Sequence, residues 1–94
     1  MPGLPLTIAA DHPALAGHFP GRPIVPGVVL LDQAILLIES VGGRSVRRIA
    51  QAKFLSPVGP GEALDVDYSI TDASVRFEIR AGERKVANGR LELA

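Results

Sequence analysis

Two side chains of the sequence, His18 and Asp32, have types and positions that suit proton transfer. His18 lies in the stretch from residue 12 to residue 27, where prolines and glycines exclude regular structure and stiffen the chain. A rigidly placed imidazole is what general acid–base catalysis needs. Asp32 interrupts the apolar run from Val28 to Val41, and a carboxyl group in apolar surroundings must be paired, hydrogen-bonded or protonated. Both residues are therefore candidates for acid–base chemistry.

Each residue taken alone also fits a structural role. A histidine in a loop is more often structural or exposed than catalytic. An aspartate in an apolar helix often makes only a local polar contact. The prolines and glycines around His18 are equally suited to a stiff connector. Composition and spacing leave the catalytic and the structural interpretations open.

The elements that would position these residues follow from the periodicity of apolar residues. Val28 to Val41 is predicted to be one helix that begins after Pro26-Gly27 and ends at Gly42-Gly43. It is apolar almost all round, which is typical of a helix buried in a core. Alternation of apolar and polar residues predicts strands, which we place at residues 4–9, 45–55, 64–71, 74–80 and 84–93.

One helix cannot cover five strands unless the sheet curls around it. The sequence therefore predicts a single α+β domain over residues 1–94, with a curved antiparallel five-stranded sheet wrapped around one central helix. Tyr68 and Phe77 fall on inward strand faces and are expected in the core. Asn88-Gly89 is expected to weaken the last strand.

The composition excludes several classes of protein. Ten acidic and ten basic residues give a net charge of zero, which argues against nucleic acid as a partner. There is no cysteine, so disulfides and cysteine metal sites are excluded. No metal or cofactor is expected. The longest apolar run is too short to span a membrane and the first residues lack the pattern of a signal peptide, so we expect a soluble, cytoplasmic protein. So short a chain buries a modest core, which favours a homodimer or a higher oligomer.

Two motifs carry a resemblance to a known family. His-Phe-Pro-Gly begins at His18, Pro-Ile-Val-Pro-Gly follows at residues 23–27, and Asp32 stands 14 residues after His18. A second motif runs from Lys53 to Glu62, as Lys-Phe-Leu-Ser-Pro-Val-Gly-Pro-Gly-Glu. In this order the motifs resemble those of the bacterial 3-hydroxyacyl-acyl carrier protein dehydratases, enzymes of hotdog fold. The Leu-Leu-Asp sequence that ends at Asp32 is similar to the corresponding segment of the small dehydratases of aryl-polyene lipid clusters.

The resemblance implies a role for each matched residue. His18 takes the place of the base that removes a proton from C2 of the acyl chain, and Asp32 that of the acid that protonates the leaving C3 hydroxyl. In this family the two residues come from different subunits and meet at a dimer interface. Gly27 would present its N–H to the thioester carbonyl at the helix N-terminus. The other substrate-binding residues implied are Phe19, Pro26 and Val28.

The sequence departs from the family at two positions. The family often has a glutamine four residues after the acid, where this chain has Leu36; Gln33 instead follows the acid directly. Residue 22 is Arg22, where asparagine or aspartate is usual. Support of Asp32 by a glutamine is therefore not expected from the same helix face.

The implied substrate is an acyl thioester on an acidic acyl carrier protein. Arg22, Arg47 and Arg48, together with Arg44 and Lys53, could form a basic rim for such a carrier, although they also fit ordinary solvated charges. Two other functions remain open. One is a non-catalytic acyl-binding chain or partner subunit of a dehydratase heterodimer, and the other is a hotdog thioesterase.

Overall fold

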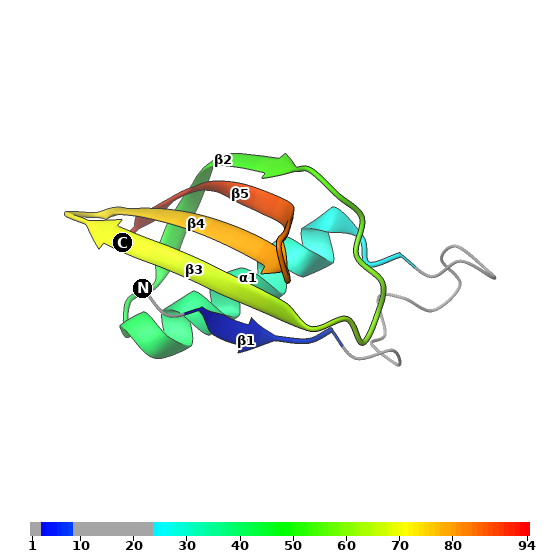
Figure 1. Cartoon of the computed structure of the whole chain (residues 1–94). Helices are drawn as coiled ribbons and strands as arrows, with labels where there is room; N and C mark the ends of the chain where they lie inside the picture. The colour runs from blue at the N-terminus through cyan, green and yellow to red at the C-terminus, as the bar shows by residue number, and fades with distance from the viewer. Residues whose placement is uncertain (1–2, 9–23) are drawn as a thin grey trace.

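The structure, a computed structural model, describes residues 3–8 and 24–94 of the chain. The elements are β1 (Leu4–Leu6), α1 (Gly27–Gly42), β2 (Val46–Phe54), β3 (Leu64–Thr71), β4 (Ser74–Ala81) and β5 (Arg84–Leu93). The strands form one sheet in the order β1-β3-β4-β5-β2, and every neighbouring pair is antiparallel. Figure 1 shows α1 lying along one face of this sheet. The predicted α+β architecture, five antiparallel strands around one helix, is confirmed.

The core lies between α1 and the inner face of the sheet. Val75, Phe77 and Ile79 alternate along β4 and are at most 4% exposed, because successive side chains of a strand point to opposite faces. Tyr68 of β3 is 8% exposed, so both aromatic residues lie in the core as predicted. From α1 the buried residues share one face, and they are Leu30, Leu31, Ala34 and Ile38.

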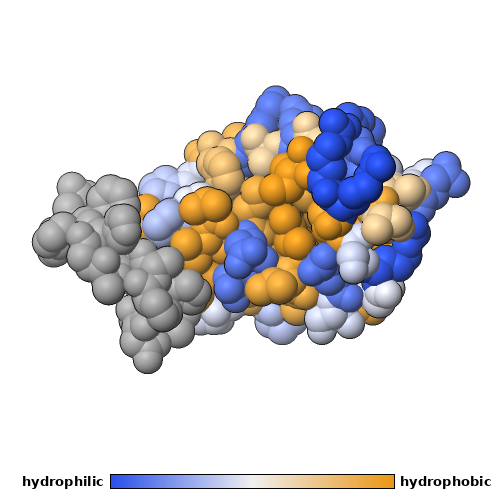
Figure 2. All heavy atoms as spheres, turned by 180° about the vertical axis from the view of Figure 1, so that it is seen from behind, coloured by the Kyte–Doolittle hydropathy of each residue, from blue (hydrophilic) through white to orange (hydrophobic). Residues whose placement is uncertain are grey.

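The opposite face of α1 is open in the single chain, which corrects one expectation. Val28 is 74% exposed and Leu36 52%. The helix is therefore not buried on all sides, since the sheet covers only one of its faces. Figure 2 shows the apolar surface that gathers on the side of the molecule carrying α1.

The ends of α1 have distinct chemistry. Pro26 occupies the N-cap position, and no side chain of the described residues caps the first turn. Gly43 ends the helix with φ 72°, and its N–H donates to Glu39 O over 2.9 Å, a conformation that glycine adopts without strain. The Glu39 carboxylate then accepts a bond from Val46 N at 2.7 Å. This contact fixes where β2 starts relative to the helix.

Strand β5 runs unbroken through Asn88-Gly89, so these two residues do not interrupt it. A Cβ at Gly89 would lie 2.2 Å from Gln51 O and 2.9 Å from the Phe77 ring. Because Gly89 has no side chain, β2 can approach β5 this closely. The pairing of β2 with β5 shifts register twice, between Val46 and Arg48 and between Ile49 and Gln51. Within the described ranges, no helix is long and apolar enough to cross a membrane.

Candidate functional site

The predicted site residues fall into two groups. His18, Phe19 and Arg22 lie outside the described residues. Pro26, Gly27 and Val28, by contrast, form the start of α1 as expected. The described part of the candidate site is therefore built around the N-terminus of this helix.

A hollow of about 370 Å³ lies against that helix end. Three segments form it: the entry to α1, the end of β2, and the loop that follows β2. Its lining is mostly apolar and comprises Ile24, Val25, Gly27, Leu30, Phe54, Leu55, Ser56, Pro57 and Val58. Sequence reasoning did not assign Phe54 or the loop residues to the site, although the motif from Lys53 to Glu62 was the signal that pointed to them.

Gly27 is the point where β2 meets the helix. A Cβ at Gly27 would lie 3.0 Å from Cε1 and Cζ of Phe54, which is closer than ordinary van der Waals contact between carbons. The missing side chain lets the Phe54 ring pack directly on the first turn. The aligned peptide dipoles give this end of α1 a partial positive charge, which favours an oxygen that gains negative charge beside it.

Asp32 does not reach the hollow within one chain. The residue is exposed and belongs to the outer face of α1, about 40° around the helix from Val28 and from Leu36. These flanking residues are themselves exposed and apolar. The apolar enclosure expected for this carboxyl group is therefore absent from the single chain as described, and a second surface would have to supply it.

Arg47 and Arg48 lie on β2 and share one acidic partner. Arg47 Nη2 is 3.1 Å from Glu92 Oε1, and Arg48 contacts the same carboxylate through Nε, at 3.1 Å, and through Nη2. The hydrogen bond from Arg48, followed by that from Arg47, holds the pKa of Glu92 below its ordinary value. The same contact raises the pKa of Arg48. Their two positive charges are thus partly neutralised.

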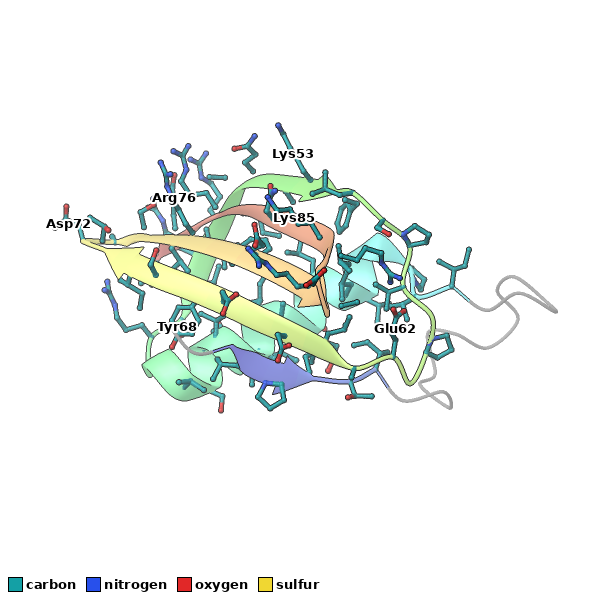
Figure 3. All side chains as sticks on the ribbon, viewed as in Figure 1. Lys53, Glu62, Tyr68, Asp72, Arg76 and Lys85 are labelled. Atoms are coloured by element: carbon teal, nitrogen blue, oxygen red, sulfur yellow. The ribbon has the colours of Figure 1, made fainter. Side chains whose placement is uncertain are left out.

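The other basic candidates are also placed. Arg44 donates to the backbone oxygens of Asp72 and Ala94, each at 3.2 Å, and thereby connects the start of β2 to the residue after β5. Lys53 is exposed and points away from the sheet in Figure 3. A larger, charged depression of about 850 Å³ lies at the β3–β4 turn, and of the predicted site residues its lining contains Arg47 alone.

The arrangement has no metal centre in its described part. Residues 3–8 and 24–94 hold no group of three or more His, Cys, Asp or Glu side chains that could bind a metal ion. The described site therefore combines an apolar hollow, a glycine that exposes backbone, and a helix N-terminus. Such a site can bind an acyl group and polarise its carbonyl.

Comparison with known proteins gives one family match. A family model described as ApeI-like, ApeI dehydratase, matches residues 3–90. Similarity to curated proteins points the same way. A 3-hydroxyacyl-(acyl-carrier-protein) dehydratase FabZ from Novosphingobium aromaticivorans is 41% identical, with 73% of this chain and 51% of that protein aligned.

A second FabZ, from a Wolbachia sp. of Drosophila simulans, is 35% identical, with 89% of this chain and 68% of that protein aligned. The chain spans about half the length of the first curated relatives it matches. Among solved structures, the dehydratase heterocomplex ApeI:P from Xenorhabdus doucetiae has a TM-score of 0.82 at 23% identity, covering 98% of this chain and 85% of that one. This likeness shows that the fold is shared.

Proposed function

The chain belongs to the ApeI-like dehydratase family, and we propose that it removes water from a 3-hydroxyacyl thioester. The family match confirms the resemblance of the two motifs, and the similarity to the ApeI:P structure confirms the hotdog fold. The product would be the trans-2-enoyl thioester, and the acyl group would be carried by acyl carrier protein. The observation that carries this proposal is the apolar hollow at the N-terminus of α1, with Gly27 in its wall. An acyl thioester needs apolar surroundings for its chain and a donor for its carbonyl oxygen.

The proposed chemistry divides between three residues. The N–H of Gly27 and the dipole of α1 stabilise the enolate-like oxygen that forms when C2 loses its proton. His18 takes that proton. Asp32 donates a proton to the C3 hydroxyl, which leaves as water. Pro26 and Val28 adjoin Gly27 but are not among the residues that line the hollow, so they and Phe19 would contact the substrate only in the completed assembly.

The exposed position of Asp32 supports a site completed by a second subunit. Val28 and Leu36 flank it on the outer face of α1 and expose 74% and 52% of their surface, which is costly for apolar side chains in a single chain. A second subunit against this face would enclose the carboxyl group and exclude water from it. We propose that His18 of one subunit and Asp32 of the other form the acid–base pair in a homodimer or a higher oligomer.

A heteromeric assembly is the second candidate. The relative from Xenorhabdus doucetiae was solved as a heterocomplex, which favours the possibility that this chain acts with a related but distinct subunit. In that case this chain would bind the acyl group or contribute only one member of the catalytic pair.

The carrier protein would dock on basic residues near the site. Arg22, Arg47 and Arg48 remain the candidates. The carboxylate of Glu92 offsets part of the positive charge of Arg47 and Arg48, because both arginines contact it. Removal of Glu92 should therefore strengthen carrier binding if Arg47 and Arg48 take part in it.

In the deciding experiment, the purified protein is incubated with a 3-hydroxyacyl thioester of acyl carrier protein, and the mass of the product is measured by mass spectrometry. Loss of one water supports the dehydratase. Release of the free acid would instead identify a thioesterase. No reaction alone, followed by reaction when a related subunit is added, would identify the heteromeric candidate. No reaction under either condition would refute the proposed function.

A further inference from the structure

The loop between β2 and β3, residues 55–63, lines the hollow but is held largely by groups outside itself. The backbone N–H groups of Leu55 and Ser56 both donate to Val86 O, over 2.8 and 3.3 Å. Further along, Pro57 and Pro60 have no N–H to donate, so the loop has few hydrogen bonds of its own. Backbone bonds to Val86, Val25 and Ile8 hold parts of the loop, and side chains that contact its backbone add to them.

Glu62 and Arg84 supply those contacts. Glu62 Oε2 accepts a bond from Gly59 N at 3.1 Å, and Glu62 Oε1 pairs with Arg84 Nη2 at 2.6 Å. The same nitrogen donates to Pro57 O at 3.2 Å. One carboxylate and one guanidinium thus connect both sides of the loop to the first residue of β5. Figure 3 shows Glu62 at the end of the molecule where α1 begins.

The same loop holds the entry to the helix. Val58 O accepts a bond from Val25 N at 2.8 Å, and the Val58 side chain is buried in the core. On its other side, Gly61 N donates to Ile8 O at 2.8 Å. Because Val25 leads through Pro26 into α1, a displaced loop would also displace the first turn of the helix, where Gly27 lies.

We propose that Glu62 and Arg84 are positioning residues, which hold the β2–β3 loop at the separation from Gly27 that turnover requires. This inference rests on the proposed dehydratase function. The Arg84 and Glu62 side chains are 46% and 32% exposed, and ion pairs of that exposure add little to global stability. A small displacement at a reacting centre, in contrast, lowers the rate strongly. The pair therefore acts on turnover more than on folding.

The first test compares Arg84→Met with Arg80→Met. Arg80 is a matched control, because its side chain is 44% exposed and pairs with Glu78 on β4, and no hydrogen bond joins it to loop residues 55–63. We expect Arg84→Met to lower kcat by roughly 10–100-fold, with KM changed by less than about threefold and Tm by about 5 °C or less. Arg80→Met should leave kcat unchanged. Arg84→Lys should recover part of the loss, because lysine keeps the positive charge and N–H donors but is shorter and lacks the planar guanidinium.

The second test exchanges the charges, as Glu62→Arg together with Arg84→Glu. The swap restores an ion pair but leaves the N–H of Gly59 and the carbonyl of Pro57 without their partners. We therefore expect the swapped protein to be as slow as Arg84→Met. Recovery of the wild-type kcat would overturn the inference, because it would show that charge attraction alone is sufficient.

Amide hydrogen exchange separates this inference from the proposed function. The amides of Val25 and Gly59 should exchange at least about tenfold faster in Arg84→Met and at the wild-type rate in Arg80→Met. Unchanged exchange in Arg84→Met, or faster exchange with an unchanged kcat, would overturn the positioning role. A wild-type protein that dehydrates no 3-hydroxyacyl thioester would refute the proposed function, and the exchange rates would still decide whether the pair holds the loop.

Discussion

Substitution of Gly27 by alanine tests the hollow with a single methyl group. The new Cβ would lie 3.0 Å from two carbons of the Phe54 ring, whereas carbons pack best at about 3.5–4.0 Å, so the ring must move by roughly 0.5–1 Å. Phe54 is 52% exposed and can turn toward solvent. Overpacking in a closed core costs about 1–3 kcal/mol, and here the open side lowers that cost.

Helix propensity acts in the other direction. Alanine is favoured over glycine by up to about 1 kcal/mol within a helix, so the free energy of unfolding should change by no more than about 1 kcal/mol in total. Activity should respond differently, because the methyl group and the displaced ring occupy the hollow. A shift of about 1 Å at a reacting centre can cost about 10²-fold in rate, and we expect a loss of that order in kcat/KM.

The assay measures dehydration of a 3-hydroxyacyl carrier-protein thioester and chemical unfolding on the same samples. Gly42→Ala is the matched control at the far end of α1, because among residues 3–8 and 24–94 a Cβ at Gly42 meets Ile70 Cδ1 alone, at 3.9 Å. This control should keep full activity. Full activity of Gly27→Ala would place the reaction elsewhere, and a loss of several kcal/mol in stability would show that Phe54 is not free to move.

Three further predictions concern catalysis, assembly and packing. His18→Ala and Asp32→Asn should each lower the dehydration rate by at least about 10²-fold with the fold intact. Their effects should not add, since both residues serve one transition state, and full activity of Asp32→Asn would show that this acid is structural. Leu36→Asp should convert an oligomer to monomer in light scattering and abolish activity, because it charges the exposed apolar face of α1, and a wild-type protein that is already monomeric would contradict the shared site. Gly89→Ala should lower the free energy of unfolding by about 1–3 kcal/mol or more, since a Cβ would lie 2.2 Å from Gln51 O. An unchanged Tm in calorimetry would show that β2 and β5 can move apart.

The sequence by itself determined the class of fold and the order of the elements, although the first strand, predicted over residues 4–9, spans Leu4–Leu6. The period-two alternation from Leu64 to Ile70 predicted β3, and the structure places that strand at Leu64–Thr71. The helix predicted over Val28–Val41 spans Gly27–Gly42. These patterns are readable because the periods of strands and helices are local properties of the chain. The motif around Gly27 and the second motif likewise indicated the family, which the family match confirms.

Contacts between distant parts of the chain were decided only by the tertiary structure. The Phe54 ring on Gly27, the two arginines of β2 on Glu92 and the bond from Val25 to Val58 all join residues far apart in sequence. No periodicity encodes which strand lies beside which, so the motif from Lys53 to Glu62 indicated residues of the hollow without showing that they lie against the start of α1.

The face of α1 shows the same limit most clearly. Its composition predicted burial on every side, yet the sheet covers only the side with Ala34 and Ile38, and leaves Asp32 and Leu36 exposed. The apolar composition of α1 indicates how much of its surface must be buried, but not which part of the protein or which partner buries it. That choice depends on the curvature of the sheet and on the second subunit that we propose, and both lie beyond the local sequence.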